Sequence, residues 1–167
     1  MRIEEYLDLE KPSKAQNRIL WIARISWSFV AMEIIISFTL PLFIEIFALD
    51  SLRAGILLSG VLIGDTIGAV IFGRLSDTIG RRKLFQISLI WYSIFTALTV
   101  LSFSYESLLV FRILAGMGLG GMLVVDPALL SEFLPRRKRG NLMVSLDLFR
   151  PFGSLLAFYW HIYFLLV

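Results

Sequence analysis

Six ionisable side chains lie inside long apolar stretches of this sequence, where a charge is costly. A charged side chain at the centre of a bilayer costs about 2.5–3.5 kcal/mol on insertion scales. Such groups are expected to face a water-filled cavity or to pair with one another, where they can bind a polar solute or a proton. The six residues are Glu33, Asp65, Arg112, Asp126, Asp147 and Arg150.

Glu33 is the first candidate for a reversible proton site. No opposite charge lies near it in its own apolar stretch, and Ser26 and Ser37 share its face of a helix. A carboxyl group in an apolar cavity can exchange a proton, because desolvation opposes its charge and a nearby arginine favours it. The pattern favours function over structure for Glu33.

The other five residues have structural alternatives. Arg112 and Asp126 are 14 residues apart, so they point within about 40° of each other on a helix. Arg112 could nevertheless anchor to carbonyl groups, and Asp126 could reach interfacial water. Asp147 and Arg150, at i and i+3, could form a neutralised ion pair. Asp65 could hydrogen-bond to a neighbouring helix.

The elements that must position these residues are predicted to be membrane-spanning helices. Hydrophobic residues make up 57% of the 167 residues, charged residues only 17%, and the mean hydropathy is +0.80. Soluble domains have about 45–50% apolar and about 25% charged residues. No apolar stretch alternates as a barrel strand does. We expect an all-α membrane protein with a segment at 1–24 and five spans at about 25–47, 55–72, 84–103, 108–130 and 142–167.

Basic residues predict how these spans are oriented. Thirteen of the lysines and arginines lie in segment 1–24 and in the second and fourth links, whereas the other two links hold only Arg53. The positive-inside rule then places the N-terminus and both basic links in the cytoplasm of a multi-pass cell-membrane protein. This placement accounts for the net charge of +3 and the pI of about 9.4 without nucleic acid as a partner.

Several classes of site are excluded by composition. The chain has no cysteine and one histidine, which removes disulfides and thiolate metal sites and makes a catalytic zinc site improbable. No nucleophile–base pair or phosphate loop is present, so we expect no enzyme, no metal and no cofactor. Segment 1–24 is acidic before any apolar run and is not a signal peptide. Within it, residues 3–9 could form an amphipathic helix, and Ser13 is expected to cap the next one.

Small residues predict close helix packing. Gly60, Gly64 and Gly68 recur every four residues in the second span, and residues 116–121 of the fourth span include four glycines. Such faces let helices approach closely. Static packing explains them, although helices that slide past each other would need the same smooth faces.

The link between the second and third spans resembles a known signature. It reads Gly73-Arg74-Leu75-Ser76-Asp77-Thr78-Ile79-Gly80-Arg81-Arg82-Lys83. This is similar to the G-x-x-x-D-R/K-x-G-R-R/K-R/K loop of the major facilitator superfamily, which lies at the same place in that fold. Thr78 departs from the pattern, because a basic residue is usual there.

Two further segments support the resemblance. Residues 112–121 resemble the R-x-x-x-G-x-G-x-G element of the family's fourth span. Glu132 and the Arg139-Gly140 pair resemble the E-x-x-x-x-x-x-R-G link of the sugar-porter and metabolite:proton-symporter branches. An acidic residue in the first span, here Glu33, is also frequent in those branches.

The resemblance implies alternating access, in which two helical bundles rock about a central site. It implies a secondary transporter of a small polar metabolite, an organic anion or a sugar, coupled to protons in a lipid bilayer. Substrate or proton binding would fall to the six ionisable residues named first. Conformational gating would fall to Gly73, Asp77, Gly80, Arg81, Arg82, Glu132 and Arg139. Asp77 would meet an arginine or a helix N-terminus, Glu132 would pair with Arg81 or Arg82, and Arg139 with a carboxylate.

The resemblance covers five spans of a fold that has twelve. We therefore expect an N-terminal part of a transporter, with its second half supplied by a missing C-terminal portion or by a partner chain. An inactive remnant, and a non-transporting membrane scaffold or partner subunit, are the alternatives. A scaffold would have no reason to carry Glu33, Asp65 and Arg112 at depth.

Overall fold

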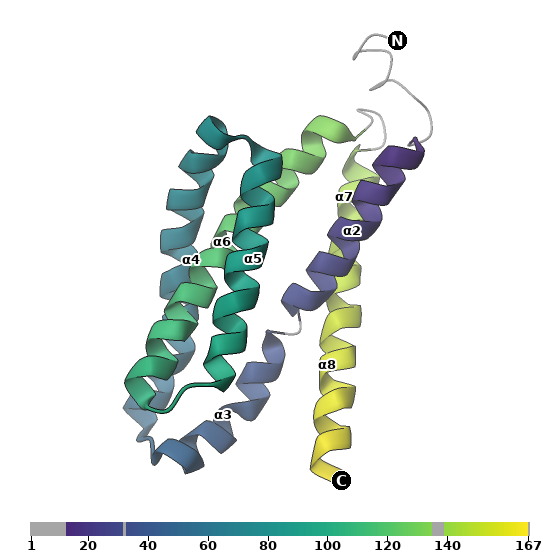
Figure 1. The fold of residues 1–167 in the computed structure, drawn as a ribbon. Helices are drawn as coiled ribbons and strands as arrows, with labels where there is room; N and C mark the ends of the chain where they lie inside the picture. The colour runs from purple at the N-terminus through teal and green to yellow at the C-terminus, as the bar shows by residue number, and fades with distance from the viewer. Residues whose placement is uncertain (1–12, 32, 135–138, 167) are drawn as a thin grey trace. The chain divides into compact units, whose positions relative to one another are not determined.

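Figure 1 shows the computed structural model of the chain, which describes residues 13–31, 33–134 and 139–166. These residues form helices joined by short links, and no strand occurs among them. The expected all-α membrane fold is confirmed for this part of the chain. The expected helix at residues 3–9 lies outside it.

Seven helices follow one another along the described residues. They are α2 (Lys14–Ala31), α3 (Ile34–Phe47), α4 (Ser51–Ile79), α5 (Arg81–Val100), α6 (Tyr105–Phe133), α7 (Arg139–Asp147) and α8 (Phe149–Leu166).

Four described segments are long and apolar enough to cross a membrane. They are Ser51–Ile79, Arg81–Val100, Tyr105–Glu132 and Gly140–Trp160. These segments correspond to the second, third, fourth and fifth expected spans. The second and fourth extend several residues beyond the expected stretch at both ends, whereas the third and fifth begin a few residues earlier and end earlier. The chain therefore crosses a membrane more than once.

The first expected span, at about 25–47, is not one continuous helix. Helix α2 begins well before residue 25 and ends at Ala31, and α3 begins at Ile34. Between them the amide of Glu33 donates to the carbonyl of Val30 at 3.1 Å, which closes a tight turn. Neither Gly nor Pro lies at this break, but three isoleucines follow it, and branched side chains lower helix propensity. That residues 25–47 cross the membrane stays a prediction.

Side-chain caps fix where three helices begin. The Ser13 amide donates to the Gln16 side chain at 2.7 Å and the Gln16 amide donates to the Ser13 hydroxyl at 3.3 Å, a reciprocal cap on α2. The carboxylate of Asp50 caps α4. Ser104 and Ser107 exchange two backbone-to-hydroxyl bonds at the start of α6. The expected cap by Ser13 is confirmed.

The described residues divide into two units, which we call unit 1 and unit 2. Unit 2 holds residues 39–128, so it contains α4, α5 and most of α6, which lie side by side (Figure 1). Gly80 joins α4 to α5 with φ of +99°, a conformation that glycine adopts without strain. At the opposite end, Leu49, Leu57 and Leu108 form a buried core.

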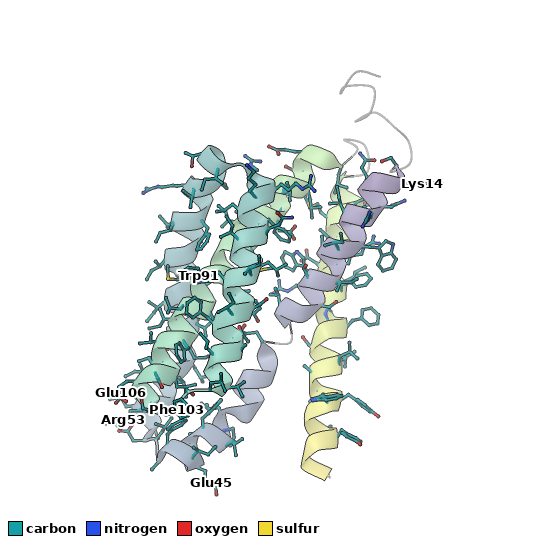
Figure 2. All side chains as sticks on the ribbon, in the orientation of Figure 1. Lys14, Glu45, Arg53, Trp91, Phe103 and Glu106 are labelled. Atoms are coloured by element: carbon teal, nitrogen blue, oxygen red, sulfur yellow. The ribbon has the colours of Figure 1, made fainter. Side chains whose placement is uncertain are left out.

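That opposite end of unit 2 is closed by a contact between α4 and α6. The Tyr105 hydroxyl donates to the carbonyl of Arg53 at 3.2 Å, and the Arg53 guanidinium lies 5.5 Å from the centre of the Tyr105 ring. Figure 2 shows Arg53 and Glu106 together at this end, near the fully exposed ring of Phe103. The link between α5 and α6 therefore exposes the apolar ring of Phe103, while the residue that follows the link, Tyr105, makes polar contacts with Arg53.

Unit 1 holds residues 1–38 and 129–167 and so is built from the two ends of the chain. Helix α2 runs beside α8, and its first half packs against α7 (Figure 1). The buried core consists of Leu20, Ala23, Leu130, Leu134 and Leu146. This core holds the early part of α2 against the last turn of α6 and against α7.

The fifth expected span is interrupted within unit 1. Helix α7 ends at Asp147 and α8 begins at Phe149, with Leu148 between them. Pro151 explains the interruption, because a proline has no N–H to donate to the carbonyl four residues earlier, here that of Asp147. Asp147 and Arg150 therefore lie on different helices, not on successive turns of one helix.

Candidate functional site

Glycines bring α4 and α6 into backbone contact within unit 2. A Cβ atom added to Gly64 would overlap the carbonyl of Ile113, and one added to Gly116 would overlap the carbonyl of Val61. No side chain can move aside there, because the neighbouring atoms belong to the backbone. The expected close packing is confirmed, and we call it the glycine seam. It consists of Gly60, Gly64, Gly68, Gly116 and Gly120.

Helix α5 packs against another side of α6. A Cβ atom at Gly118 would lie 2.7 Å from the amide nitrogen of Tyr92 and 2.9 Å from the carbonyl oxygen of Ser88. Beside this contact, Nε1 of Trp91 donates to the Leu114 carbonyl at 2.8 Å (Figure 2). An indole N–H buried in an apolar bundle needs such a partner. Helix α6 is thus held from two sides.

Two opposite charges on α6 are buried. Arg112 is 4% exposed and Asp126 is 3% exposed. The two residues share the inner face of the helix, as their spacing predicts, but they are about 21 Å apart along its axis and do not contact each other directly. One helix therefore presents a buried cation near one end and a buried carboxylate near the other.

Asp65 on α4 lies beside the part of α6 between Arg112 and Asp126. Its half-buried side chain packs on Gly120, where an added Cβ atom would be 2.7 Å from Asp65 Oδ1. Gly120 is eight residues after Arg112 and six before Asp126 on α6. Unit 2 thus places three of the predicted ionisable residues along one pair of helices. Their roles stay predictions.

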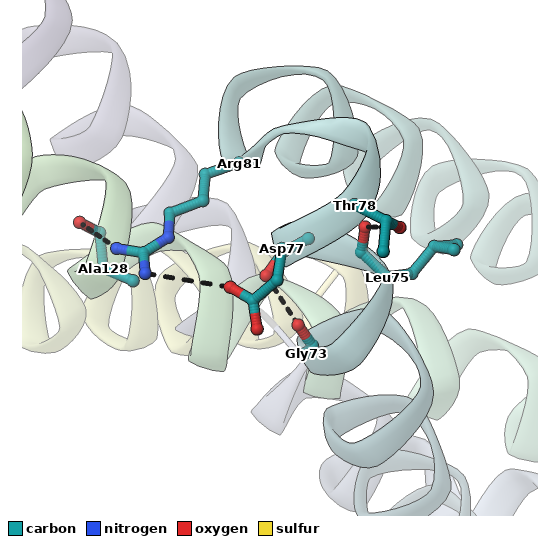
Figure 3. A network of polar contacts seen from close by, with 7 residues as sticks. Gly73, Leu75, Asp77, Thr78, Arg81 and Ala128 are labelled. Carbon is teal, nitrogen blue, oxygen red and sulfur yellow. Dashed lines mark hydrogen bonds and ion pairs between the residues drawn. The ribbon is translucent and has the colours of Figure 1, made fainter.

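The signature loop forms a polar network at the α4–α5 junction (Figure 3). Nη2 of Arg81 lies 3.8 Å from Oδ1 of Asp77, and Nη1 of Arg81 donates to the carbonyl of Ala128 at 3.3 Å. Asp77 therefore meets an arginine, one of the two expected partners, through the side chain of Arg81. Arg81 thereby ties the α4–α5 junction to the later part of α6.

The remaining residues of the loop differ in how much the structure requires them. Position 80 needs a glycine, because the φ of Gly80 is +99°. Gly73 has room for a side chain, since a Cβ atom added there would lie 3.5 Å from the Val124 side chain. The Thr78 hydroxyl donates to the Leu75 carbonyl at 3.0 Å within its own helix (Figure 3). Thr78 therefore makes a local contact at the position where the family has a basic residue.

For three other gating candidates the expected pairs are not settled. Arg82 and Glu132 are exposed, and the side chain of Arg139 lies outside what the structure describes. The pairing of Glu132 with Arg81 or Arg82, and of Arg139 with a carboxylate, stays a prediction.

In unit 1 the alternative in which Asp147 and Arg150 form a neutralised ion pair is wrong. The two side chains are exposed and form no ion pair with each other, because the helix is interrupted at Leu148 between them. The guanidinium of Arg150 instead lies 5.2 Å from the centre of the Trp27 ring on α2. The sequence alone did not indicate that Trp27 contacts Arg150.

Arg24 is a second residue that the sequence analysis missed. Its Nη2 donates to the Ser145 hydroxyl at 2.7 Å, and its guanidinium lies 5.0 Å from the Trp21 ring and 5.5 Å from the Phe149 ring. These contacts join α2 to both sides of the α7–α8 interruption. The available signal was the placement of Trp21 and Trp27 three residues on either side of Arg24.

Glu33 lies at the break between α2 and α3 and is half-buried. Ser26, one of its expected neighbours, is buried on α2, and the side chain of Ser37 lies outside what the structure describes. A carboxylate at a helix break in a membrane protein suits ion or proton binding. That role stays a prediction. Among the described residues, no group of acidic, histidine or cysteine side chains could hold a metal ion.

The chain matches a known family over most of its length. The family described as "Sugar (and other) transporter" matches residues 7–165. The niacin transporter NiaP of Acinetobacter baylyi is 36% identical over 164 residues, which cover 92% of this chain and 37% of that protein. The inner membrane metabolite transport protein YgcS of Escherichia coli is 37% identical over 109 residues, covering 65% of this chain and 24% of that protein.

A human relative is similar to a comparable degree. Synaptic vesicle glycoprotein 2B of Homo sapiens is 36% identical over 123 residues, which cover 74% of this chain and 18% of that protein. The chain therefore spans less than two fifths of the length of each of these three relatives.

Proposed function

Because the chain belongs to the sugar (and other) transporter family of the major facilitator superfamily, we propose that its protein carries a small polar metabolite across a membrane by alternating access. The observation that carries this proposal is the burial of Arg112 and Asp126 on the apolar helix α6. Burying charges of both signs in a membrane helix is costly, and a polar pathway explains the cost. Transport rather than catalysis also agrees with the names of the relatives.

An organic anion is the proposed cargo. Arginine forms forked, charge-assisted hydrogen bonds with carboxylates, and Arg112 and Arg150 are candidates for this contact. The relative from Acinetobacter baylyi carries niacin in its name, and niacin is a pyridine carboxylic acid. Nicotinate is therefore the first probe for uptake.

We place the protein in the cell membrane with its N-terminus and both basic links in the cytoplasm. Rocking needs a second bundle, and we propose that further residues of the same protein or a partner chain supply it. Experiments should therefore use the product of the complete reading frame, reconstituted in lipid vesicles. Uptake of labelled nicotinate above that of empty vesicles supports the proposal, and uptake equal to theirs contradicts it.

Replacing Glu33 with glutamine should abolish uptake driven by a pH gradient but leave the exchange of internal for external substrate. Exchange moves substrate in both directions without a net proton, whereas accumulation needs a group that gains and loses one. The measurement is labelled uptake with and without an imposed gradient. Glu45→Gln is the matched control, because Glu45 is an exposed carboxylate on the adjoining helix α3. Undiminished gradient-driven uptake by Glu33→Gln would contradict the assignment.

Replacing Asp77 with asparagine should shift the conformational equilibrium while leaving membrane insertion intact. The pair with Arg81 is largely exposed, with Asp77 at 71%, so its loss should change that equilibrium by at most about fivefold. These 167 residues contain no cysteine, so single cysteines introduced here report accessibility once any cysteine elsewhere in the protein is replaced. Thr78→Ala is the control, because the Thr78 hydroxyl bonds only its own helix. Equal labelling rates in Asp77→Asn and the parent would overturn the assignment.

A further inference from the structure

Arg150 lies at the centre of an apolar segment. The last candidate span is Gly140–Trp160, and Arg150 is ten residues from each of its ends. A guanidinium at that depth is costly unless an anion or water accompanies it. The residues around Arg150 should therefore indicate which class of anion it binds.

The described residues around Arg150 supply an aromatic ring and no ion pair. The guanidinium lies over the Trp27 ring at 5.2 Å, and Asp147 forms no ion pair with it. Trp27 is half-buried, whereas Arg150 is exposed. A guanidinium that stacks on an indole still offers the N–H groups at its edge to a planar anion.

The backbone that carries Arg150 is held firmly to the helix that carries Trp27. The Ser28 hydroxyl donates to the carbonyl of Phe149 at 3.1 Å, directly before Arg150. A Cβ atom at Gly153 would overlap the carbonyl of Ser28, so the two helices touch there as well. With Arg24 against the Phe149 ring, these contacts fix the approach of α8 to α2 on both sides of Arg150.

We propose that Arg150 and Trp27 form a recognition pair for a planar aromatic carboxylate. The carboxylate would accept two hydrogen bonds from the edge of the guanidinium, and the attached ring would then lie beside the indole. This inference rests on the proposed transport function and deepens it by naming the substrate class. Trp27 would select the aromatic ring, and Arg150 would select the charge.

The depth of the pair separates this ligand from two others. A phospholipid phosphate stays at the membrane surface, whereas Arg150 is at the middle of its span. A sugar has no charge to neutralise the guanidinium. A small aromatic acid supplies both the charge and the flat face.

The test is equilibrium binding to the purified product of the complete reading frame, measured by isothermal titration with three probes. Nicotinate has the ring and the charge, nicotinamide has the ring without the charge, and cyclohexanecarboxylate has the charge without an aromatic ring. We expect the parent protein to bind nicotinate about tenfold or more tightly than either of the other two. Ratios taken on one sample do not depend on the fraction of protein that is folded.

Each variant should remove one preference and keep the other. Trp27→Leu should bring the ratio of nicotinate to cyclohexanecarboxylate close to one while nicotinate still binds better than nicotinamide. Arg150→Gln should lower the ratio of nicotinate to nicotinamide severalfold, because the charge of Arg112 remains. Trp27→Phe and Arg150→Lys should restore part of each preference. Trp160→Leu, which removes an exposed tryptophan of α8, is the control and should change neither ratio.

Two results would overturn the recognition pair. One is a parent protein that does not distinguish nicotinate from nicotinamide, and the other is a Trp27→Leu variant that weakens both carboxylates equally. Failure of the proposed function looks different. Selective binding without any uptake in vesicles would refute transport and leave the pair standing, whereas uptake of a neutral metabolite without carboxylate binding would refute the pair alone.

Discussion

A single methyl group added at Gly64 should force α4 away from α6 and destabilise unit 2. The new Cβ atom would overlap the backbone carbonyl of Ile113, and a carbonyl held in a helix cannot rotate away. Overpacking a close contact costs about 1–3 kcal/mol, which corresponds to a fall in melting temperature of roughly 2–12 °C for a chain of this size. Thermal unfolding of purified Gly64→Ala in detergent measures the effect.

Gly55 provides the matched control on the same helix. No atom lies within 4 Å of a Cβ built there, so Gly55→Ala adds the same methyl group without a clash. Alanine is also the better helix former by about 1 kcal/mol, so this variant should be as stable as the parent or more stable. Equal melting temperatures for Gly64→Ala and Gly55→Ala would show that the glycine seam is looser than the structure indicates.

Replacing Arg112 with glutamine should weaken nicotinate binding by about tenfold to a hundredfold. Hydrogen bonds to a charged group contribute about 1.5–3 kcal/mol, and glutamine keeps a polar side chain while it removes the charge. Arg112 is buried on α6, so glutamine also relieves the cost of a charge at depth. The expected signature is a large loss of affinity with a melting temperature that does not fall, measured by titration and by thermal unfolding.

Arg18, an exposed arginine of α2, provides the control for losing a positive charge at another position. Arg18→Gln should change neither affinity nor stability. Arg112→Lys keeps the charge but not the planar fork, so it should recover only part of the affinity. A melting temperature that drops in Arg112→Gln with unchanged nicotinate affinity would identify Arg112 as a structural anchor instead.

Composition and local pattern predicted much of this fold because the signals are local. The spans follow from apolar length, the cap at Ser13 from its hydroxyl, and the glycine seam from a repeat of four residues. Asp77 met an arginine as the signature loop implied. Each of these features depends on residues within a few turns of one another.

Other features could not be predicted because they depend on neighbours distant in the chain or on a backbone irregularity. Trp27 and Arg150 are far apart in sequence and meet only when α2 packs on α8. The expected pair of Asp147 and Arg150 assumed a continuous helix and neglected Pro151. The break before Glu33 has no Gly or Pro to announce it.

The division into two units bears on the order in which the chain is assembled. Unit 2 is one continuous segment, so its helices can pack as soon as residue 128 has entered the membrane. Unit 1 cannot complete its packing at that stage, because Arg24 and Ser28 bond to residues 121 positions later in the chain. At about 5–20 residues per second, a ribosome needs roughly 6–24 s to add them. During that interval α2 lacks its partners on α7 and α8, including those of the Arg24 guanidinium, so its packing must be completed late in synthesis.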